Sequence, residues 1–424
     1  MGFIFCLSKQ VIVKSEEVWI AWWGCVYKYP TNSKNYNTIN PKNCSFIFIW
    51  HKLLKNKSFS YIIGLMKIIS LSLANFRNYE SQQVFFDGGL NVLHGKNASG
   101  KTNMLESVYL CSLLRSPRTT KDKELIRMGA SRAKITLVVE KKFRKHTITI
   151  FIDEQGKKKV AIDGIPVQRA GELLGVLGVV FFSPDELKLV KESPAERRGF
   201  LDVGLSQQQK AYFSALQRYN KTLKQKNNLL KESRNAENLD DMLDIWDIGL
   251  AEQGAIIIRK RMEYVEELNR YASASHEKIS SGKEKLKLSY ETAVSTHDDI
   301  RRNLEEALLS SRAKDKELGY CTVGPHRDDI KIEIDGIDAR KFASQGQQRT
   351  IALAMKLGEV ELYKKETGET PILLLDDVLS ELDKTRRDIL LSATEGVQTI
   401  LTCTEFDGEN AKLFEVKEGK IIKG

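Results

Sequence analysis

The chain has 424 residues, which is long enough for two or more packed units with sizeable cores. Its 42% hydrophobic content is typical of globular proteins and argues against a largely disordered chain. The formal net charge of +10 favours an anionic partner, but residues 1–65 contribute +6 of it (eight Lys, two Glu), which leaves 10 − 6 = +4 for the rest. A nucleic-acid partner must therefore be argued from where cations cluster.

Residues 1–65 differ in character from the rest of the chain. They hold four of the five Trp and three of the six Cys, and Lys, Asn and Pro interrupt their apolar runs. No run reaches the roughly 18 apolar residues of a membrane span, and no signal-peptide pattern is present. We expect a poorly ordered upstream extension, with Met66 as the natural start. A genuine small N-terminal domain is the alternative.

The six Cys are scattered without a C-x-x-C pair, and the six His lack H-x-x-x-H spacing. This excludes the common zinc and thioredoxin-like patterns and favours a reducing compartment. We therefore expect a cytoplasmic protein without membrane segments.

A glycine-rich segment follows a strand predicted at residues 84–93 and precedes a helical pattern in which Met104, Val108 and Cys111 share a face. It fits G-x-x-x-x-G-K-[ST], and its context aims backbone N–H groups and a helix dipole at bound phosphate. We expect a nucleoside triphosphate here, with Lys101 on the outer phosphates and Thr102 on Mg²⁺. A chance match in an ordinary turn is the alternative. The predicted binding residues of this P-loop are Gly95, Lys96, Asn97, Ala98, Ser99, Gly100, Lys101 and Thr102.

Strand patterns surround the P-loop, and a helical pattern follows them. Up to Ser183-Pro184, alternating apolar residues predict an antiparallel layer and one further strand. The apolar period then changes from two to about 3.6 residues until about residue 312, which predicts a compact helical lobe. Ser206 with Gln209 would cap the first of its long helices. The strands predicted before the lobe are 67–73, 84–93 with a Gly88-Gly89 turn, 135–139, 148–152, 160–162 and 178–182.

Strands return after the lobe, around residues 330–334, 371–375, 399–402 and a final hairpin at 413–422. The simplest architecture is one sheet domain interrupted by the helical lobe. Its parts are residues 66–182, an ATPase part with the P-loop; 183–312, the helical lobe; and 313–424, the rest of the ATPase part.

The apolar run at residues 372–375 ends in Asp376 and Asp377, as suits a parallel strand buried on both faces. Ligands in open α/β sheets lie beyond the carboxyl ends of the strands, so Asp376 stands where a P-loop enzyme holds Mg²⁺. Asp377 could polarise the attacking water as a general base. A turn rich in Asp is the alternative.

Ser344 and Gln347 precede an apolar helix and form a capping box. The same serine, glycine and helix N-terminus would also make a second phosphate-binding surface.

From Met66 onward, 424 − 65 = 359 residues, the chain resembles the RecF family of DNA replication and repair proteins. Each short motif alone is weak, but together and in family order they are specific. The segments that carry the resemblance are residues 67–79, the P-loop with Asn103, 118–126, 182–184, 324–329, 344–349 and 375–383.

The resemblance implies an α/β, ABC-type P-loop ATPase head: a mixed sheet with an antiparallel layer, interrupted by the helical lobe. ATP and Mg²⁺ would be the cofactors, Lys101, Asp376 and Asp377 the catalytic residues, and Thr102 and Asp376 the metal ligands. Ser344 and Gln347 would bind ATP across an ATP-dependent homodimer. Transporter relatives carry a switch His where Thr402-Cys403-Thr404 stands here, so slow hydrolysis is expected. Residues 1–65 depart from the family.

The resemblance also implies a role in DNA repair, replication and the SOS response. Such proteins act with RecO and RecR to help load RecA at single-strand gaps, as weak DNA-dependent ATPases without chemistry on DNA. Sequence-tolerant binding to double-stranded DNA and gap junctions is expected. The alternatives are an ATPase subunit of a transporter or of another DNA-processing complex, such as an ABC-linked nuclease.

DNA contacts are expected from clustered Lys and Arg that bind the phosphate backbone. For the helical-lobe set, a solvated helix face is the alternative. The candidates are Arg115, Arg118, Lys121 and Lys123 after the P-loop helix, and Arg218, Lys221, Lys224 and Lys226 in the helical lobe.

Overall fold

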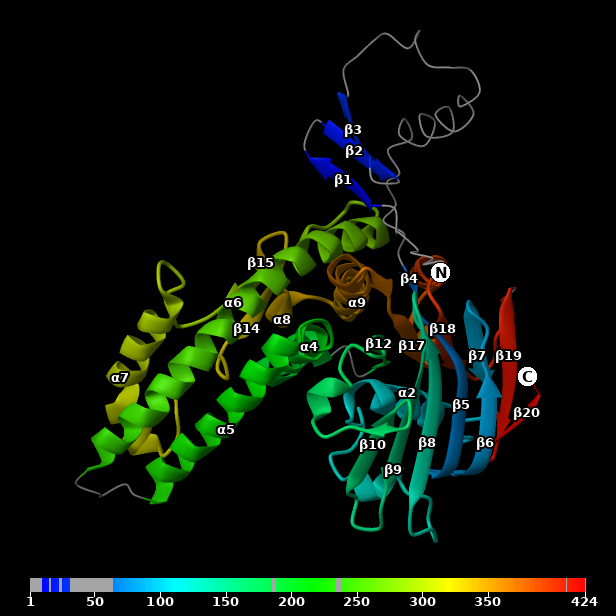
Figure 1. The fold of residues 1–424 in the computed structure, drawn as a ribbon, viewed down its shortest axis with the longest axis horizontal. Coiled ribbons are helices and arrows are strands. Elements are labelled where there is room, and N and C mark those ends of the chain that lie inside the picture. The colour runs from blue at the N-terminus through cyan, green and yellow to red at the C-terminus, as the bar shows by residue number, and fades with distance from the viewer. Residues whose placement is uncertain are drawn as a thin grey trace, which may run out of the picture. The chain divides into compact units, whose positions relative to one another are not determined.

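The structure, a computed structural model, describes residues 10–14, 17–22, 25–30, 64–184, 188–232, 238–408 and 410–423. The chain forms two compact units, Met1–Tyr61 and Ile62–Gly424 (Figure 1). In the first, β1 (Gln10–Lys14), β2 (Glu17–Trp22) and β3 (Cys25–Pro30) form an antiparallel sheet. The predicted poor order of residues 1–65 concerns mostly residues outside the described ones and stays a prediction.

A six-stranded sheet at the centre of the second unit brings the predicted site motifs to one edge. All its neighbouring strands run parallel except the final hairpin. Because the carboxyl ends of β7, β17 and β18 share an edge, the P-loop, Asp376 and Thr402 meet there. The order is β12 (Val179–Phe182), β17 (Ile372–Asp376), β18 (Thr399–Cys403), β7 (Leu90–His94), β19 (Ala411–Lys417) and β20 (Lys420–Lys423).

The predicted antiparallel layer is present as a second six-stranded sheet. Its strands alternate buried and exposed residues, because one face packs on the core and the other faces solvent. The predicted strand at 84–93 is instead two strands in different sheets, since the Gly88-Gly89 segment carries the chain from one sheet to the other. The order is β11 (Ile165–Pro166), β10 (Lys158–Ile162), β9 (Lys145–Ile152), β8 (Ala133–Glu140), β5 (Lys67–Phe76) and β6 (Tyr79–Phe85).

Helix α2 (Lys101–Leu113) follows the P-loop and contacts strands of both sheets. Buried residues occur all around it, as expected for a helix enclosed between two layers. The other face of the central sheet is covered by helices: Leu373 and Leu375 of β17 point to the helical core, and Ile372 and Leu374 to the α2 side. This alternation explains why the β17 sequence is continuously apolar.

The helical lobe is longer than predicted and contains a strand. It continues to Leu318, and Leu286 and Leu288 lie in a strand inside the expected helical segment. The alternation with Lys285 and Lys287 was too short to stand out. The helices are α3 (Lys188–Lys191), α4 (Pro194–Gln208), α5 (Lys210–Glu232), α6 (Leu239–Ser280) and α7 (Ile300–Leu318), and β13 (Leu286–Glu291) pairs with β14 (Asp329–Ile334), next to β15 (Ile337–Asp338).

The predicted Ser206–Gln209 capping box is wrong. Ser206 is buried inside α4, and Gln209 is the residue at which α4 ends before α5 begins. The hydrophobic stripe that continues through both helices hid this boundary.

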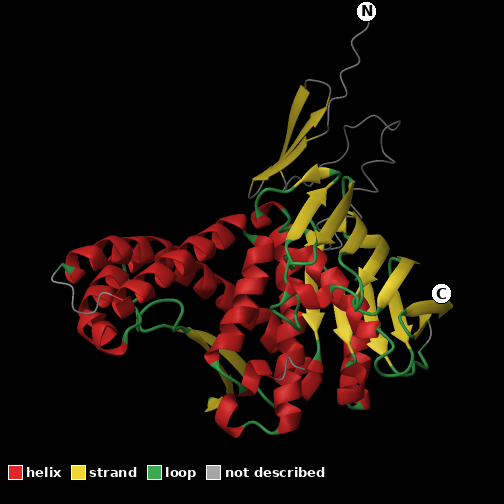
Figure 2. Ribbon diagram, turned by 90° about the horizontal axis from the view of Figure 1, so that it is seen from below, coloured by secondary structure: helices red, strands yellow, loops and turns green. Residues whose placement is uncertain are grey.

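The chain returns from the lobe through α8 (Ala339–Phe342) and α9 (Gln345–Thr367), and α10 (Lys384–Ala393) follows the β17 strand. Helices α6 and α9 pack closely: a Cβ at Gly358 would lie 2.9 Å from the Ala272 backbone nitrogen. Figure 2 shows the long helices gathered beside the two sheets. The short strands β4 (Gly64–Leu65) and β16 (Glu369–Thr370) pair separately. Among the described residues, no helix is long and apolar enough to cross a membrane.

Candidate nucleotide-binding site

The P-loop backbone can be built only with glycine at two points. Gly95 and Gly100 have φ angles of 145° and 118°, which side-chain-bearing residues rarely adopt. A Cβ at Gly95 would lie 2.3 Å from the Val416 carbonyl oxygen, and one at Gly100 would lie 2.5 Å from Asn78 Nδ2. The loop is therefore pressed against β19 on one side and the β5–β6 turn on the other.

The turn between β5 and β6 hydrogen-bonds to the carbonyl groups of the P-loop, a role that the sequence did not predict. Asn78 Nδ2 donates to the Ser99 carbonyl (2.9 Å), and the Tyr79 hydroxyl donates to the Gly100 carbonyl (3.0 Å). The Gly419 N–H also donates to the Ser99 carbonyl, at 2.8 Å. These bonds hold the loop carbonyls away from the ligand side. The N–H groups of the α2 N-terminus remain for phosphate.

Lys101 is buried and lies over the loop. Its Nζ donates to the carbonyls of Gly95 (2.6 Å) and Lys96 (2.9 Å). Burial lowers the pKa of Lys101, while the nearby Asp377 carboxylate opposes this shift. The Ser99 hydroxyl is buried, and no described residue hydrogen-bonds to it. A buried cation and an orphaned buried hydroxyl in a glycine cradle are the donors that a phosphate group would satisfy.

Asp376, at the end of β17, receives two hydroxyl groups on one carboxylate oxygen. Thr102 Oγ1 donates to Oδ1 at 2.8 Å, and Thr402 Oγ1 donates to the same atom at 2.7 Å. These hard oxygen atoms fit Mg²⁺, which typically keeps several waters and takes one or two carboxylates plus substrate phosphates. Within the described ranges, no cluster of three or more His, Cys, Asp or Glu side chains could hold a metal.

Asp377 adopts a left-handed conformation, with φ of 53°. Its N–H is directed at Thr402, 3.0 Å from the hydroxyl oxygen and 3.2 Å from the carbonyl oxygen. Non-glycine residues in this region are uncommon and cluster at functional sites, although Asp tolerates it better than most. The conformation turns the chain sharply at the carboxyl end of β17.

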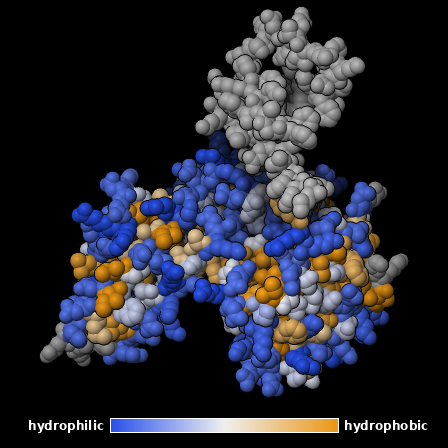
Figure 3. All heavy atoms as spheres, in the orientation of Figure 1, coloured by the Kyte–Doolittle hydropathy of each residue, from blue (hydrophilic) through white to orange (hydrophobic). Residues whose placement is uncertain are grey.

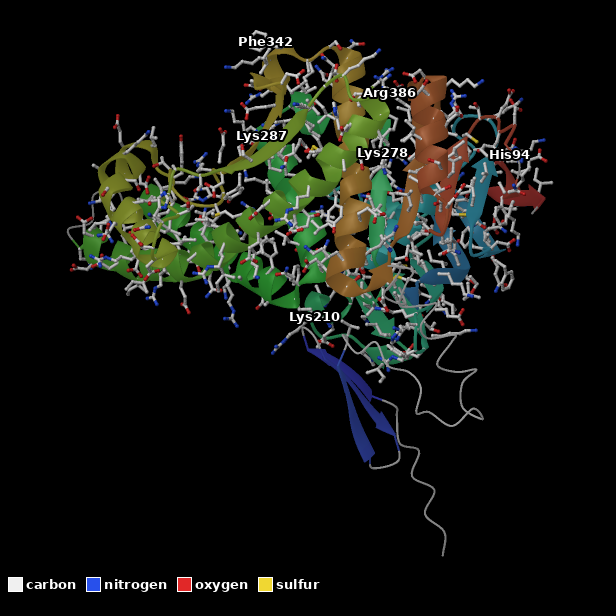
Figure 4. All side chains as sticks on the ribbon, turned by 90° about the horizontal axis from the view of Figure 1, so that it is seen from above. His94, Lys210, Lys278, Lys287, Phe342 and Arg386 are labelled. Carbon is white, nitrogen blue, oxygen red and sulfur yellow. The ribbon has the colours of Figure 1, made fainter. Side chains whose placement is uncertain are left out.

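The signature element, as we call the predicted second phosphate-binding surface at residues 344–349, makes no hydrogen bond or ion pair to the P-loop among the described residues of its own chain. Ser344 caps α9: its Oγ accepts from the Gln347 N–H (3.3 Å), and its N–H donates to Gln347 Oε1 (2.7 Å). In Figure 4, Phe342, next to this element, lies at the top of the view, whereas His94, next to the P-loop, lies toward its right side. The two elements are therefore separated within one chain.

The Gln347 side chain is hydrogen-bonded inside its own chain, and its predicted role across a dimer stays a prediction. Its Nε2 donates to Glu284 Oε1 at 2.9 Å. Arg386 Nη2 also donates to the Gly346 carbonyl at 3.1 Å, and Arg349 Nη2 lies 2.5 Å from Glu381 Oε2. The contacts with Arg386 and Glu381 tie the start of α9 to the segment after β17, and the contact with Glu284 ties it to the segment before β13. They leave the Ser344 hydroxyl and the free N–H groups of the first α9 turn as the groups that would meet phosphate.

The sequence matches the family model described as RecF/RecN/SMC N terminal domain over residues 67–407. The DNA replication and repair protein RecF of Agathobacter rectalis is 47% identical over 360 residues, covering 85% of this chain and 98% of the relative. That of Lachnoclostridium phytofermentans is 43% identical over 365 residues, covering 85% of this chain and 100% of the relative.

Solved structures agree with these relatives. A structure of the recombination mediator protein RecF with ATP, described as acting in the RecFOR pathway, matches with a TM-score of 0.80 and 38% identity, covering 85% of this chain and 98% of that chain. This chain belongs to the RecF family. An SMC head domain from Pyrococcus furiosus, 17% identical with a TM-score of 0.51, shares the fold only.

Family membership confirms the resemblance and the fold class inferred from the motifs, an α/β ABC-type ATPase head with a helical lobe. The curated relatives are DNA replication and repair proteins, which favours DNA processing over the transporter alternative. The assignment of individual site residues rests on the geometry above and stays a prediction.

A buried thiol lies in the segment Thr402-Cys403-Thr404, where transporter relatives are expected to carry a switch His. Cys403 lies next to Lys101, and burial raises the pKa of its thiol to about 11. The thiol is therefore neutral at physiological pH and offers neither a charge nor a general base to the phosphate.

One of the predicted DNA-binding residues is placed where it cannot touch DNA. Lys226 is fully buried, and its Nζ lies 2.8 Å from Asp247 Oδ1 and 3.1 Å from Asp315 Oδ2. It joins α5, α6 and α7, since a buried ammonium requires such paired carboxylates. The prediction was wrong for this lysine because its spacing from Arg218, Lys221 and Lys224 suggested that all four share an exposed helix face. The predicted residues that are exposed are Arg115, Arg118, Lys121, Lys123, Arg218, Lys221 and Lys224.

Proposed function

We propose that the chain is an ATP-dependent DNA-binding protein of recombinational repair and replication, which dimerises around ATP on DNA. The observation that carries this proposal is the separation of two half-sites within one chain. The P-loop supplies a phosphate cradle, whereas Ser344 and the first turn of α9 supply free donors away from it. A partner's signature element would complete each P-loop, so ATP favours the closed dimer.

Within each closed site, the residues would divide the work. The P-loop N–H groups and Lys101 would bind the phosphates, and Thr102 with Asp376 would hold Mg²⁺. When bound, Mg²⁺ would neutralise phosphate charge. Asp377 would orient and deprotonate water, and Ser344 of the partner subunit would close the site over the outer phosphate.

Slow hydrolysis follows from the residues at the end of β18. Thr402-Cys403-Thr404, with a neutral Cys403 thiol, would stand where transporter relatives carry a switch His that contacts the phosphate. The enzyme would be a weak, DNA-dependent ATPase, and hydrolysis would reopen the dimer rather than alter DNA.

The expected setting is the cytoplasm, with RecO and RecR as partners and RecA loading at single-strand gaps as the outcome. The description of a solved relative as a recombination mediator of the RecFOR pathway supports these partners.

The gating step is tested by measuring the molar mass of the protein with ATP, with ADP and without nucleotide, by gel filtration with light scattering. The expected result is a dimer with ATP alone, and tighter binding to gapped duplex DNA in the same condition. An oligomeric state that ignores nucleotide would contradict gating, even if DNA still bound.

Of the two predicted DNA-binding segments, helix α5 is a stronger candidate than the segment after the P-loop helix. Between Lys210 and Lys231 the sequence contains no acidic residue, and its exposed positions are mainly Lys, Arg, Asn, Gln and Ser. Figure 3 shows a notch between the helical lobe and the antiparallel layer, and α5 lies along its lobe side (Figure 1). An acid-free polar face of this kind suits phosphate contacts without base readout.

Replacing Arg218, Lys221 and Lys224 together with glutamine is expected to weaken DNA binding and its salt dependence. Each lost phosphate contact lowers the slope of log affinity against log salt by about 0.9, so the slope should fall by up to about 2.7. Fluorescence anisotropy with a gapped duplex, over a salt series and with ATP, measures both quantities.

The matched control exchanges three exposed cations of α7, Arg301, Arg302 and Lys314, for glutamine. Arg301 and Arg302 are paired with Glu305 and Glu306 on the same helix, and the change in net charge is identical. An equal loss in both triple variants would mean a general charge effect and would reject α5 as the contact surface.

A further inference from the structure

Thr402 is buried beside the two acidic residues of the candidate site, where its hydroxyl makes two different hydrogen bonds. It donates its single hydrogen to Asp376 Oδ1 at 2.7 Å and accepts the N–H of Asp377 at 3.0 Å, an N–H that also reaches the Thr402 carbonyl oxygen at 3.2 Å. A hydroxyl has one hydrogen and two lone pairs, so this arrangement fixes its orientation. One side chain therefore holds a carboxylate of one acid and the backbone of the next.

The two acids need this support for different reasons. Asp377 has a φ of 53°, a conformation that costs a side-chain-bearing residue free energy and persists only where surrounding contacts fix it. Asp376 accepts both Thr102 and Thr402 on Oδ1, and within the described ranges no hydrogen bond reaches its Oδ2. The unengaged oxygen is the one left for a ligand.

We propose that Thr402 is a positioning residue for ATP hydrolysis, which holds Asp376 and Asp377 in place relative to the P-loop. The inference rests on the proposed ATPase function and deepens it. Strand β18 lies directly beside β17, with Thr402 paired to Asp376 in register. A residue at this position acts through the acids and does not itself touch the nucleotide. Such supporting partners typically contribute about 10- to 100-fold to metal affinity or activity.

The test uses three variants of the full chain. Thr402→Val removes the hydroxyl while keeping the branched shape in a buried strand, and Thr402→Ser restores the hydroxyl. Thr399→Val is the matched control, because Thr399 is equally buried on β18 and its hydroxyl donates only to the Val397 carbonyl. The readouts are kcat and KM for ATP, the Mg²⁺ concentration for half-maximal turnover, affinity for a fluorescent ATP analogue in EDTA, and the melting temperature without nucleotide.

For Thr402→Val, kcat should fall about 10- to 100-fold and the Mg²⁺ requirement should rise, since Asp376 loses one of its two hydroxyl donors and the Asp377 N–H loses the closer of its two acceptors. Nucleotide affinity in EDTA should stay within about twofold of the parent, because P-loop contacts alone determine it. Thr402→Ser should recover most of kcat, and Thr399→Val should keep the parent kcat.

A Thr402→Val protein with the kcat and Mg²⁺ requirement of Thr399→Val would overturn the inference. So would a Thr402→Ser protein as impaired as Thr402→Val, because packing of the methyl group would then be the cause. If the parent protein turns over no ATP, the proposed ATPase function fails. In that case, the affinity for the ATP analogue is compared with and without Mg²⁺. An equal gain in affinity from Mg²⁺ in the parent and in Thr402→Val would overturn the inference.

Discussion

Replacing Lys101 with methionine is expected to abolish ATP-dependent dimerisation. Methionine keeps the length and apolar stem of this buried side chain but removes the ammonium group that reaches into the loop. Hydrogen bonds to charged groups each contribute about 1.5–3 kcal/mol, so losing two phosphate contacts should weaken ATP binding by about 100-fold or more. Titration with a fluorescent ATP analogue measures this loss, and light scattering with ATP measures the dimer.

The variant must fold for this result to carry weight. Its melting temperature without nucleotide should stay close to that of the parent protein, because only two loop carbonyls lose a donor. Lys159→Met is the matched control: Lys159 is an exposed residue of β10, and its loss removes the same charge elsewhere. A Lys101→Met protein that still dimerises at the ATP concentration sufficient for the parent would contradict the proposed site.

The parts of the site that the sequence predicted are those encoded locally. The P-loop is a contiguous sequence pattern, and its glycines at positions 95 and 100 are required because the backbone there has positive φ angles. The apolar run of β17 predicted a strand buried on both faces and placed Asp376 and Asp377 at its carboxyl end. Each of these features follows from a few neighbouring residues and their period.

The parts that were missed depend on residues far apart in the chain. The double contact of Thr402 requires the order of strands in the central sheet. Support of the P-loop by Asn78 and the pairing of Gln347 with Glu284 require the packing of separate elements. The burial of Lys226 could not be predicted from sequence, because it depends on how three helices pack together. The position of Thr402 at the end of an apolar strand was a usable signal, but its strand neighbour could not be read from sequence.

Replacing Asp377 with asparagine is expected to stop turnover and to trap the closed dimer. Asparagine, like aspartate, tolerates the left-handed conformation seen at this position, so the N–H bond to Thr402 should survive. Its neutral amide does not accept a proton from water. Since a general base contributes about 100- to 10,000-fold, kcat should fall by that factor while ATP affinity changes only a few-fold.

The contrast with alanine separates chemistry from backbone strain. Alanine at position 377 loses the same carboxylate and also lacks a side chain that favours the left-handed region, at a cost of about 1–2 kcal/mol. Asp377→Ala should therefore lose turnover and melt at a lower temperature, whereas Asp377→Asn should lose turnover alone.

With ATP, Asp377→Asn should remain dimeric and dissociate from gapped DNA more slowly than the parent, as measured by competitor chase. Turnover at the parental rate in Asp377→Asn would place the base elsewhere, and a dimer that still opened after ATP addition would separate hydrolysis from DNA release.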